Sequence, residues 1–296
     1  MRLGTLRDDY GDDELCHVHD RHLIPVRHVN AVFGTFFQNQ LDGLLTEGQL
    51  DDLLAWHARE GEERLSRVPE ASVHWNRSRP GKLLPHPRKI WGIGLNYPDH
   101  AGDLNEATPS REPASFMKPD TTLIAPGEPI QLPDPAMTQR VTGEAELAIV
   151  IGRECRNVPE ADWLSAVAGF TSALDMTAED ILRRNPRNLT QAKSFDTFLS
   201  LGPELVTPDE FPDLGATTVA TVLNGEVIRE NTLSAMTFSP AFLVSYHSRI
   251  MTLLPGDVIL TGTPGAVVLA PGDVLECRIS GLQPLLNPVA GPPLRE

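Results

Sequence analysis

Three carboxylates in the middle of the chain could bind a metal ion. Glu144 and Glu146 stand two residues apart in VTGEAELAIVIG, residues 141–152, and on a β-strand this spacing puts both side chains on one face, about 7 Å apart. The pair alone is typical of a solvated strand face, but the apolar residues that follow indicate a buried strand, where like charges need a cation. Asp175 follows a second apolar run, residues 168–174, and could add a third ligand at the end of that strand. Carboxylates without histidine or cysteine suit Mg²⁺, Mn²⁺ or Ca²⁺ better than Zn²⁺ or Cu²⁺.

A histidine and a lysine could supply proton transfer and positive charge. His100 and Asp103 lie three residues apart after Pro98, which favours a short helix with both side chains on one face. A carboxylate that orients an imidazole is typical of a general base. The local sequence alone favours a surface histidine with a chance acidic neighbour, and it likewise favours a surface lysine for Lys193, in TQAKSFD.

The string CHVHDRH, residues 16–22, is the most metal-like local sequence. His17 and His19 would share one face of a strand. No second half of a zinc-ligand set follows at the expected spacing, so we expect a solvated strand and turn here.

Composition excludes several classes of partner. The 296 residues contain 40 Asp and Glu against 25 Lys and Arg, a formal net charge of −15, which argues against a nucleic acid or an anionic membrane as partner. The three cysteines, Cys16, Cys155 and Cys277, form no C-x-x-C pair and indicate no disulfide framework. No stretch has the length and apolarity of a membrane span, and the acidic N-terminus does not resemble a secretory signal. We therefore expect a cytoplasmic protein.

The elements that must position these side chains are mainly strands. Residues 219–228 are two alternating runs around Asn224-Gly225, a strong hairpin signal. Further strands are expected at residues 258–261 and 274–279, and helices near residues 159–166, 178–184 and 239–249. This pattern predicts an α+β, mainly β catalytic domain over residues 86–296.

The first 85 residues are expected to form a small N-terminal α+β domain. Residues 38–68 have a helical pattern in which Thr46 would begin a capping box and Gly61 would end the helix. The stretch NRSRPGKLLPHP, residues 76–87, is rich in Pro, Gly and basic residues and is typical of a linker.

These pieces, in this order, resemble the fumarylacetoacetate hydrolase family. The strings that carry the resemblance are KIWGIGLNYPDHAGD from Lys89, FMKP from Phe116, GEAELAIVIG from Gly143, AGFTSALDMTAED from Ala168, AKSFDTF from Ala192, LNGEV from Leu223 and LLPGDVILTGTP from Leu253. They extend from residue 89 to about residue 290. The resemblance implies a rolled mixed β-sandwich, a homodimer, and bound Mg²⁺ or Mn²⁺, with Ca²⁺ as an alternative.

The resemblance also implies a role for each candidate residue. The metal ligands would be Glu144, Glu146 and Asp175; the catalytic groups His100 as general base, Asp103 as its partner and Lys193 as a stabiliser of negative charge; and the substrate contacts Tyr97, Lys118 and Thr263.

Two positions depart from the family pattern after Asp175. The family commonly continues Ala-Arg-Asp-x-Gln, whereas this chain has Glu179 for the arginine and Leu182 for the glutamine. A leucine cannot replace a hydrogen bond from a glutamine, so these positions predict a different substrate or a different role. A nearby arginine, Arg183, Arg184 or Arg187, could restore the lost positive charge.

The implied activity is metal-dependent hydrolysis of a C–C bond in an acylpyruvate-like 2,4-dioxo acid. The same stabilisation of an enolate serves an isomerase or decarboxylase of 2-hydroxyhepta-2,4-dienedioate-type or 2-oxo dicarboxylic acids in aromatic catabolism. A member that binds metal and a small acid without turnover is a third possibility, supported by Glu179 and Leu182.

Overall fold

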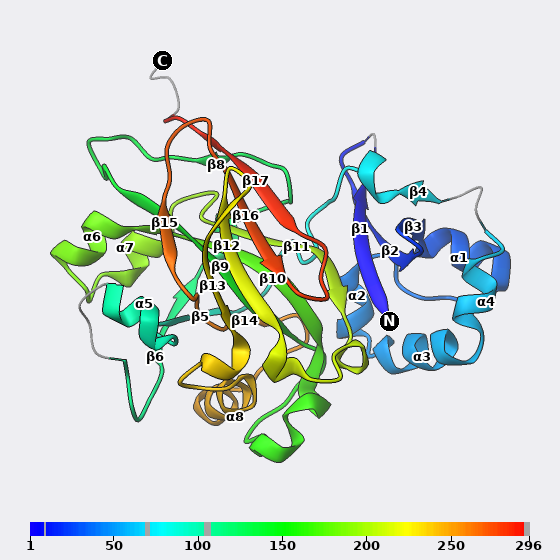
Figure 1. Cartoon of the computed structure of the whole chain (residues 1–296). Coiled ribbons are helices and arrows are strands. Elements are labelled where there is room, and N and C mark those ends of the chain that lie inside the picture. Colours follow the sequence, from blue (N-terminus) through cyan, green and yellow to red (C-terminus); the bar gives the residue numbers. More distant parts are fainter. Residues whose placement is uncertain (9, 69–71, 104–107, 293–296) are drawn as a thin grey trace.

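The computed structural model describes residues 1–8, 10–68, 72–103 and 108–292 and, within them, all side chains except those of Glu62, His100 and Asp103. Two mixed β-sheets form a sandwich, and the helices lie around it (Figure 1). This is the α+β, mainly β sandwich predicted from the sequence, and the predicted fold class is confirmed.

The larger sheet contains, in spatial order, β4 (Val73–His74), β3 (His22–Pro25), β2 (Asp13–His19), β1 (Arg2–Arg7), β11 (Leu199–Val206), β10 (Val167–Ala178), β9 (Val141–Ile151), β14 (Val258–Leu260), β5 (Ile90–Gly94) and β6 (Ala114–Lys118), with β15 (Ala266–Val268) beside β9 and β7 (Leu123–Ile124) beside β11. The smaller sheet contains β13 (Glu226–Thr232), β12 (Thr218–Leu223), β16 (Val274–Ile279), β17 (Leu285–Ala290) and β8 (Ile130–Gln131). The helices are α1 (Val26–Phe33), α2 (Leu41–Thr46), α3 (Leu50–Trp56), α4 (Glu62–Leu65), α5 (Pro98–Asp103), α6 (Glu179–Arg184), α7 (Leu189–Lys193) and α8 (Pro240–Ile250).

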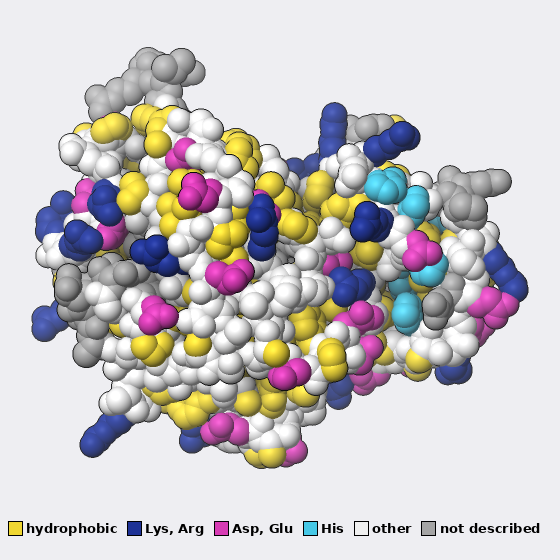
Figure 2. All heavy atoms as spheres, in the orientation of Figure 1, with side chains coloured by type: hydrophobic (Ala, Val, Ile, Leu, Met, Phe, Trp, Pro, Cys, Tyr) yellow, Lys and Arg dark blue, Asp and Glu magenta, His cyan; other side chains and the backbone are white. Residues whose placement is uncertain are grey.

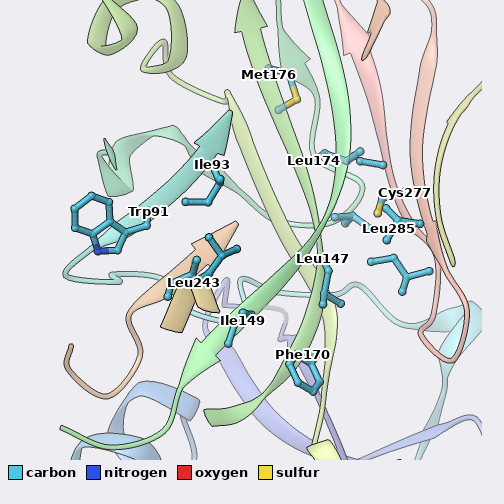
Figure 3. Close-up of a cluster of buried hydrophobic side chains, with 14 of the residues drawn as sticks. Trp91, Ile93, Leu147, Ile149, Phe170, Leu174, Met176, Leu243, Cys277 and Leu285 are labelled. Carbon is cyan, nitrogen blue, oxygen red and sulfur yellow. The ribbon is translucent and has the colours of Figure 1, made fainter. Parts of the chain in front are cut away.

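Strands β9 and β10 are the centre of the molecule, and every residue of both is buried. They pair antiparallel along their length, with Glu144 opposite Asp175. Because side chains alternate along a strand, one face of β9 presents residues such as Leu147 to the smaller sheet. Figure 3 shows Leu147 and Leu174 on the side of the larger sheet that faces Cys277 and Leu285 of the smaller sheet.

The opposite face of β9 has two different neighbours. In the second half of the strand, Ala148 and Val150 pack into a second apolar core that includes Leu3 and Leu53 of the N-terminal segment. In the first half, the same face carries Glu144 and Glu146, which follow the same alternation. Apolar packing at one end of the strand thus holds the carboxylates in place at the other.

The N-terminal segment continues the larger sheet. β1 pairs antiparallel with β11, so the sheet runs from the first residues into the part of the chain that carries the carboxylates. The division into domains at about residue 85 stays a prediction.

Several locally encoded elements agree with the sequence. β12 and β13 form the hairpin expected around Asn224-Gly225, and both turn residues have positive φ, 53° and 84°. Helices α6 and α8 and strand β16 lie where they were expected. β10 is longer than predicted, since it runs through Asp175 to Ala178.

The predicted helix boundaries in the N-terminal segment are wrong. Thr46 ends α2 and its hydroxyl donates to the carbonyl of Asp42, so it caps no following helix. Gly61 does not end the helix either, because a π-helical turn, His57–Gly61, leads directly into α4. A Cβ on Gly61 would lie 2.9 Å from the ring of His57, so this glycine provides room for the imidazole.

The prediction of a solvated strand for residues 16–22 is also wrong in part. Cys16 and His17 are fully buried in β2, and only the following turn is exposed. Figure 2 shows histidine side chains gathered on the surface of this N-terminal part. The described residues hold no group of three metal-binding side chains at this string.

Over the described part of the chain, no helix has both the length and the apolarity needed to cross a membrane. The three cysteines are present as free thiols.

Candidate active site

Glu144, Glu146 and Asp175 come together on one face of β9 and β10. One carboxylate oxygen from each lies within 4.8 Å of the others. Their exposed fractions are 9%, 1% and 0%. The alternative of a solvated strand face is therefore wrong, and the cost of burying three carboxylates must be offset by positive charge.

Two buried lysines supply part of that charge. The ammonium of Lys193 donates to Asp175 Oδ2 at 2.7 Å and to Glu144 Oε2 at 3.0 Å. Lys118 donates to Asp175 Oδ1 at 2.7 Å and to the backbone carbonyl of Lys193. Burial disfavours the charged form of Asp175, but the two ammonium groups outweigh it and hold its pKa below the usual value. The formal charges of three carboxylates and two lysines sum to −1.

Glu146 is the carboxylate with the least compensation. It accepts a hydrogen bond from the backbone N–H of Gly262 at 2.5 Å. Burial, reinforced by the charges of Asp175 and Glu144, raises its pKa well above the ordinary value for a glutamate. A divalent cation at this point would favour the ionised form, and oxygen-only donors fit Mg²⁺, Mn²⁺ or Ca²⁺.

A tight loop after β14 places the Gly262 N–H. Gly262 has a φ of +93°, and a Cβ there would lie 2.8 Å from Cβ of Asn96, so both the conformation and the close approach require glycine. The Asn96 amide donates to the carbonyls of Thr261 at 2.8 Å and Phe238 at 3.0 Å. This buried asparagine fixes the loop against Glu146.

An aromatic ring lies beside Lys193. Its ammonium is 4.9 Å from the ring centroid of Phe116 on β6, within range of a cation–π interaction. A Cβ on the facing Gly92 would lie 2.2 Å from that ring. Gly92 thus allows Phe116 to approach, and the ring helps to hold the lysine in place.

The three residues predicted to contact substrate are all buried. Lys118 directs its ammonium to Asp175 and to backbone carbonyls. The Thr263 hydroxyl donates to the carbonyl of Gly265 within its own loop. Tyr97 is fully buried in the core, its hydroxyl has no hydrogen-bond partner among the described residues, and burial raises its pKa. Their roles in substrate binding stay predictions.

The predicted general base lies outside what the structure describes. His100 and Asp103 belong to α5, and a helix beginning at Pro98 was expected, but their side chains are not among the described ones. Their proposed pairing therefore stays a prediction.

Glu179, the residue that departs from the family pattern, is buried and carries two arginines. Its carboxylate accepts from Arg140 Nε through one oxygen and from Arg183 Nη2 through the other. Arg183 was one of the arginines considered from the sequence, whereas Arg140 was missed. The sequence positions could have revealed this contact. Arg140 precedes Glu144 by four residues, and Glu179 follows Asp175 by four. Antiparallel pairing of the two strands therefore brings Arg140 and Glu179 together. Leu182 packs against the apolar core.

Comparison with known proteins agrees with this fold. Residues 89–290 match the family described as fumarylacetoacetate (FAA) hydrolase C-terminal. The mitochondrial oxaloacetate tautomerase fahd2 of Xenopus laevis is 38% identical over 225 residues, 72% of this chain and 70% of that protein.

Two solved structures are similar over nearly the whole chain. The 5-carboxymethyl-2-hydroxymuconate delta-isomerase of Mycobacterium smegmatis is 30% identical, with a TM-score of 0.75, over 99% of this chain and 100% of that one. Maleylpyruvate hydrolase of Sphingobium sp. SYK-6, solved with manganese(II) ion and pyruvate, is 25% identical, with a TM-score of 0.78, over 99% of this chain and 100% of that one. The resemblance noted in the sequence is thus confirmed, and this chain belongs to the fumarylacetoacetate hydrolase family.

Proposed function

We propose that the protein is a divalent-metal-dependent enzyme that interconverts the keto and enol forms of a 2-oxo acid. The observation that supports this most directly is the buried set of Glu144, Glu146 and Asp175 with Lys193 beside it. These groups offer a cation site and a lysine ammonium at one point.

The charges of the site favour an anionic substrate. Three carboxylates and two lysines sum to −1, so a divalent ion would bring the set to +1. Mg²⁺ or Mn²⁺ held there would supply Lewis-acid stabilisation of negative charge on a substrate oxygen. A 2-oxo acid has a carboxylate and a carbonyl oxygen suited to such a site.

The chain's own groups would orient the substrate and move its proton. Lys193, held by Asp175 and Glu144, would stabilise negative charge that develops on the enolate oxygen. His100, with Asp103 as its partner, would carry the proton to and from the carbon. Lys118 would keep Asp175 and the backbone of Lys193 in position.

Keto–enol isomerisation takes precedence here over the C–C hydrolysis first expected from the sequence. Isomerisation needs a stabilised enolate and a proton carrier but no activated water. Over 99% of this chain the isomerase is 30% identical and the hydrolase 25%, and the relative named as an oxaloacetate tautomerase is 38% identical over 225 residues. Glu179 and Leu182 also differ from the family pattern from which hydrolysis was predicted.

Hydrolysis of an acylpyruvate is the second candidate. It is favoured by the similarity to maleylpyruvate hydrolase, whose structure contains manganese and pyruvate. The homodimer and the cytoplasmic location expected from the sequence are retained in this proposal, and sedimentation analysis would test the first.

Ultraviolet absorbance of oxaloacetate, acetylpyruvate and fumarylpyruvate would separate the activities. The enol band of freshly dissolved oxaloacetate should relax faster with enzyme and Mg²⁺ or Mn²⁺ than with enzyme and EDTA, without release of pyruvate. Release of pyruvate from the acylpyruvates would establish the hydrolase, and its release from oxaloacetate the decarboxylase. Tight metal and oxalate binding without any turnover would identify a non-catalytic member and overturn the proposal.

A further inference from the structure

An ion-paired group at the ends of β9 and β10 lies next to the proposed metal site. Glu179 is buried, with 8% of its side chain exposed, whereas Arg140 is 45% exposed and Arg183 is 60% exposed. Each carboxylate oxygen of Glu179 accepts from one of the two arginines. The group has two positive charges and one negative charge, so it carries a net positive charge of one.

This group lies just beyond the ends of the two strands that carry the three carboxylates. Glu144 lies opposite Asp175, and the backbone N–H of Glu179 donates to the carbonyl of Arg140, which extends the same pairing beyond the strand ends. Arg140 directly precedes β9 and Glu179 directly follows β10 as the first residue of α6. The pair therefore lies four residues beyond the opposed Glu144 and Asp175, about 13 Å along the strands between Cα positions.

The residues between the two groups, on the face of the strands that carries the carboxylates, are short and polar. They are Thr142 and Thr177, a directly opposed pair. Thr177 donates through its hydroxyl to Glu144 Oε1 at 2.8 Å. No long side chain of β9 or β10 on this face separates the carboxylate cluster from the arginines.

Arg140 has donors to spare. Its Nε donates to Glu179, and its two Nη groups have no hydrogen-bond partner among the described residues. A guanidinium fixed through Nε presents these Nη groups as a fork that matches a carboxylate. Glu179 would then act as a positioning residue, because it fixes Arg140 without neutralising the whole group.

We propose that Arg140, positioned by Glu179, recognises a second carboxylate at the far end of the substrate, so that the site selects 2-oxo dicarboxylic acids over 2-oxo monocarboxylic acids. This inference rests on the proposed function, since it assumes that the 2-oxo end binds at Glu144, Glu146 and Asp175. The competing explanation is an ion pair that only stabilises the start of α6, and it predicts no discrimination between the two acids.

Binding of two matched ligands to the Mn²⁺-loaded protein tests the proposal without requiring turnover. 2-Oxoglutarate and 2-oxopentanoate have the same five-carbon chain and differ in the distal carboxylate. By calorimetry the wild type should bind 2-oxoglutarate about 10- to 100-fold more tightly, the range expected for charged hydrogen bonds. Arg140→Gln should remove this preference while leaving the Kd of 2-oxopentanoate within about threefold.

Two further variants complete the test. Arg156→Gln removes an exposed arginine that donates to Thr252, and it should leave the preference unchanged. Glu179→Gln should reduce the preference through loss of positioning, and Arg140→Lys should restore it only in part because a lysine lacks the fork.

The outcomes distinguish this inference from the proposed function. If both acids bind equally to the wild type, or if Arg140→Gln weakens both equally, the inference is overturned while the 2-oxo acid site stands. If neither acid binds the Mn²⁺-loaded protein at millimolar concentration, the proposed function fails and the inference fails with it. A preference for 2-oxoglutarate that survives Arg140→Gln would assign the distal carboxylate to another residue and overturn the role of Arg140.

Discussion

The carboxylate cluster and the core around His17 both bury polar side chains, but they treat them differently. In the cluster, Asp175 lies between Lys118 and Lys193, and each ammonium is within 2.7 Å of it. In the N-terminal core, His17 is fully buried and neither ring nitrogen has a hydrogen-bond partner among the described residues. The first region keeps its charges by pairing them, and the second keeps a neutral ring without a partner.

The difference reflects what each region has to do. Charged groups in a low-dielectric interior are tolerated only when paired, and replacing such pairs with apolar residues is often stabilising. The cluster of five ionisable groups on β9, β10, α7 and β6 therefore lowers the stability of the fold, and this cost indicates a functional role. His17 packs against Trp56 at 5.4 Å and His57 at 6.1 Å between ring centroids, as a core side chain would.

Removing the negative charge of Asp175 should have the largest effect on stability and on metal binding. Asp175→Asn preserves shape but takes away the partner of both lysines, and breaking a buried pair costs about 3–5 kcal/mol. We expect the free energy of unfolding of the metal-free protein to fall by this amount and Mn²⁺ affinity to fall more than about 100-fold. Urea unfolding and calorimetry with Mn²⁺ measure the two effects.

The exposed Asp196→Asn is the matched control, and it should change neither quantity. Unchanged Mn²⁺ affinity in Asp175→Asn would remove Asp175 from the metal site. An increase in stability would show that the lysines need no acidic partner, and the contrast with His17 would then be lost.

Lys193 and Lys118 should have different roles, the first in turnover and the second in stability. Lys193→Met should lower turnover about 10²- to 10³-fold with Mn²⁺ binding retained, as for loss of one charge-stabilising donor. Lys118→Met should mainly lower the free energy of unfolding, by about 3–5 kcal/mol, because its ammonium is enclosed by Asp175 and backbone carbonyls.

Turnover per metal-loaded, folded molecule decides between these roles. If Lys118→Met loses turnover as severely as Lys193→Met while its KM rises, Lys118 contacts substrate as the family resemblance implies. If Lys193→Met keeps full turnover, the ammonium serves only to balance charge.

Much of the fold could be predicted because its signals are local. The Asn224-Gly225 turn requires positive φ at both residues, which that dipeptide adopts readily, and the flanking alternation defines the two strands. The N-terminal helices were predicted less well because tertiary contacts override capping patterns. Thr46 ends one helix instead of beginning another, and the ring of His57 packs over Gly61 where a helix end was expected.

The site was predictable as a set of residues but not as a network. The spacing of Glu144 and Glu146 predicted that they share one strand face, and the resemblance to the family predicted Asp175 as the third ligand. The contact between Lys118 and Lys193 joins residues 75 positions apart, and no local pattern encodes it. Arg140 was missed because its partner Glu179 lies 39 residues away, at the start of α6, although the register of β9 and β10 brings the two together.

Acid sensitivity at His17 is the smallest expected effect, and it tests the other side of the comparison. Burial, with a smaller contribution from His57, lowers the pKa of His17 to about 3 in the folded protein. An unfolded histidine titrates near pH 6.5. Between these values the unfolded chain binds the additional proton, so the stability contributed by neutral His17 is fully present above about pH 6.5 and is lost as the pH falls.

His17→Leu removes this titration and the two unpartnered nitrogens. From pH 7.5 to pH 5.5 the free energy of unfolding of the wild type should fall by about 1.4 kcal/mol more than that of the variant. Urea unfolding at the two pH values measures the difference, and His86→Gln, at an exposed position, should behave as the wild type does. Equal pH dependence in His17→Leu and the wild type would mean that a hydrogen-bond acceptor stabilises the protonated ring in the folded protein. The N-terminal core would then pair its polar group, just as the carboxylate cluster does.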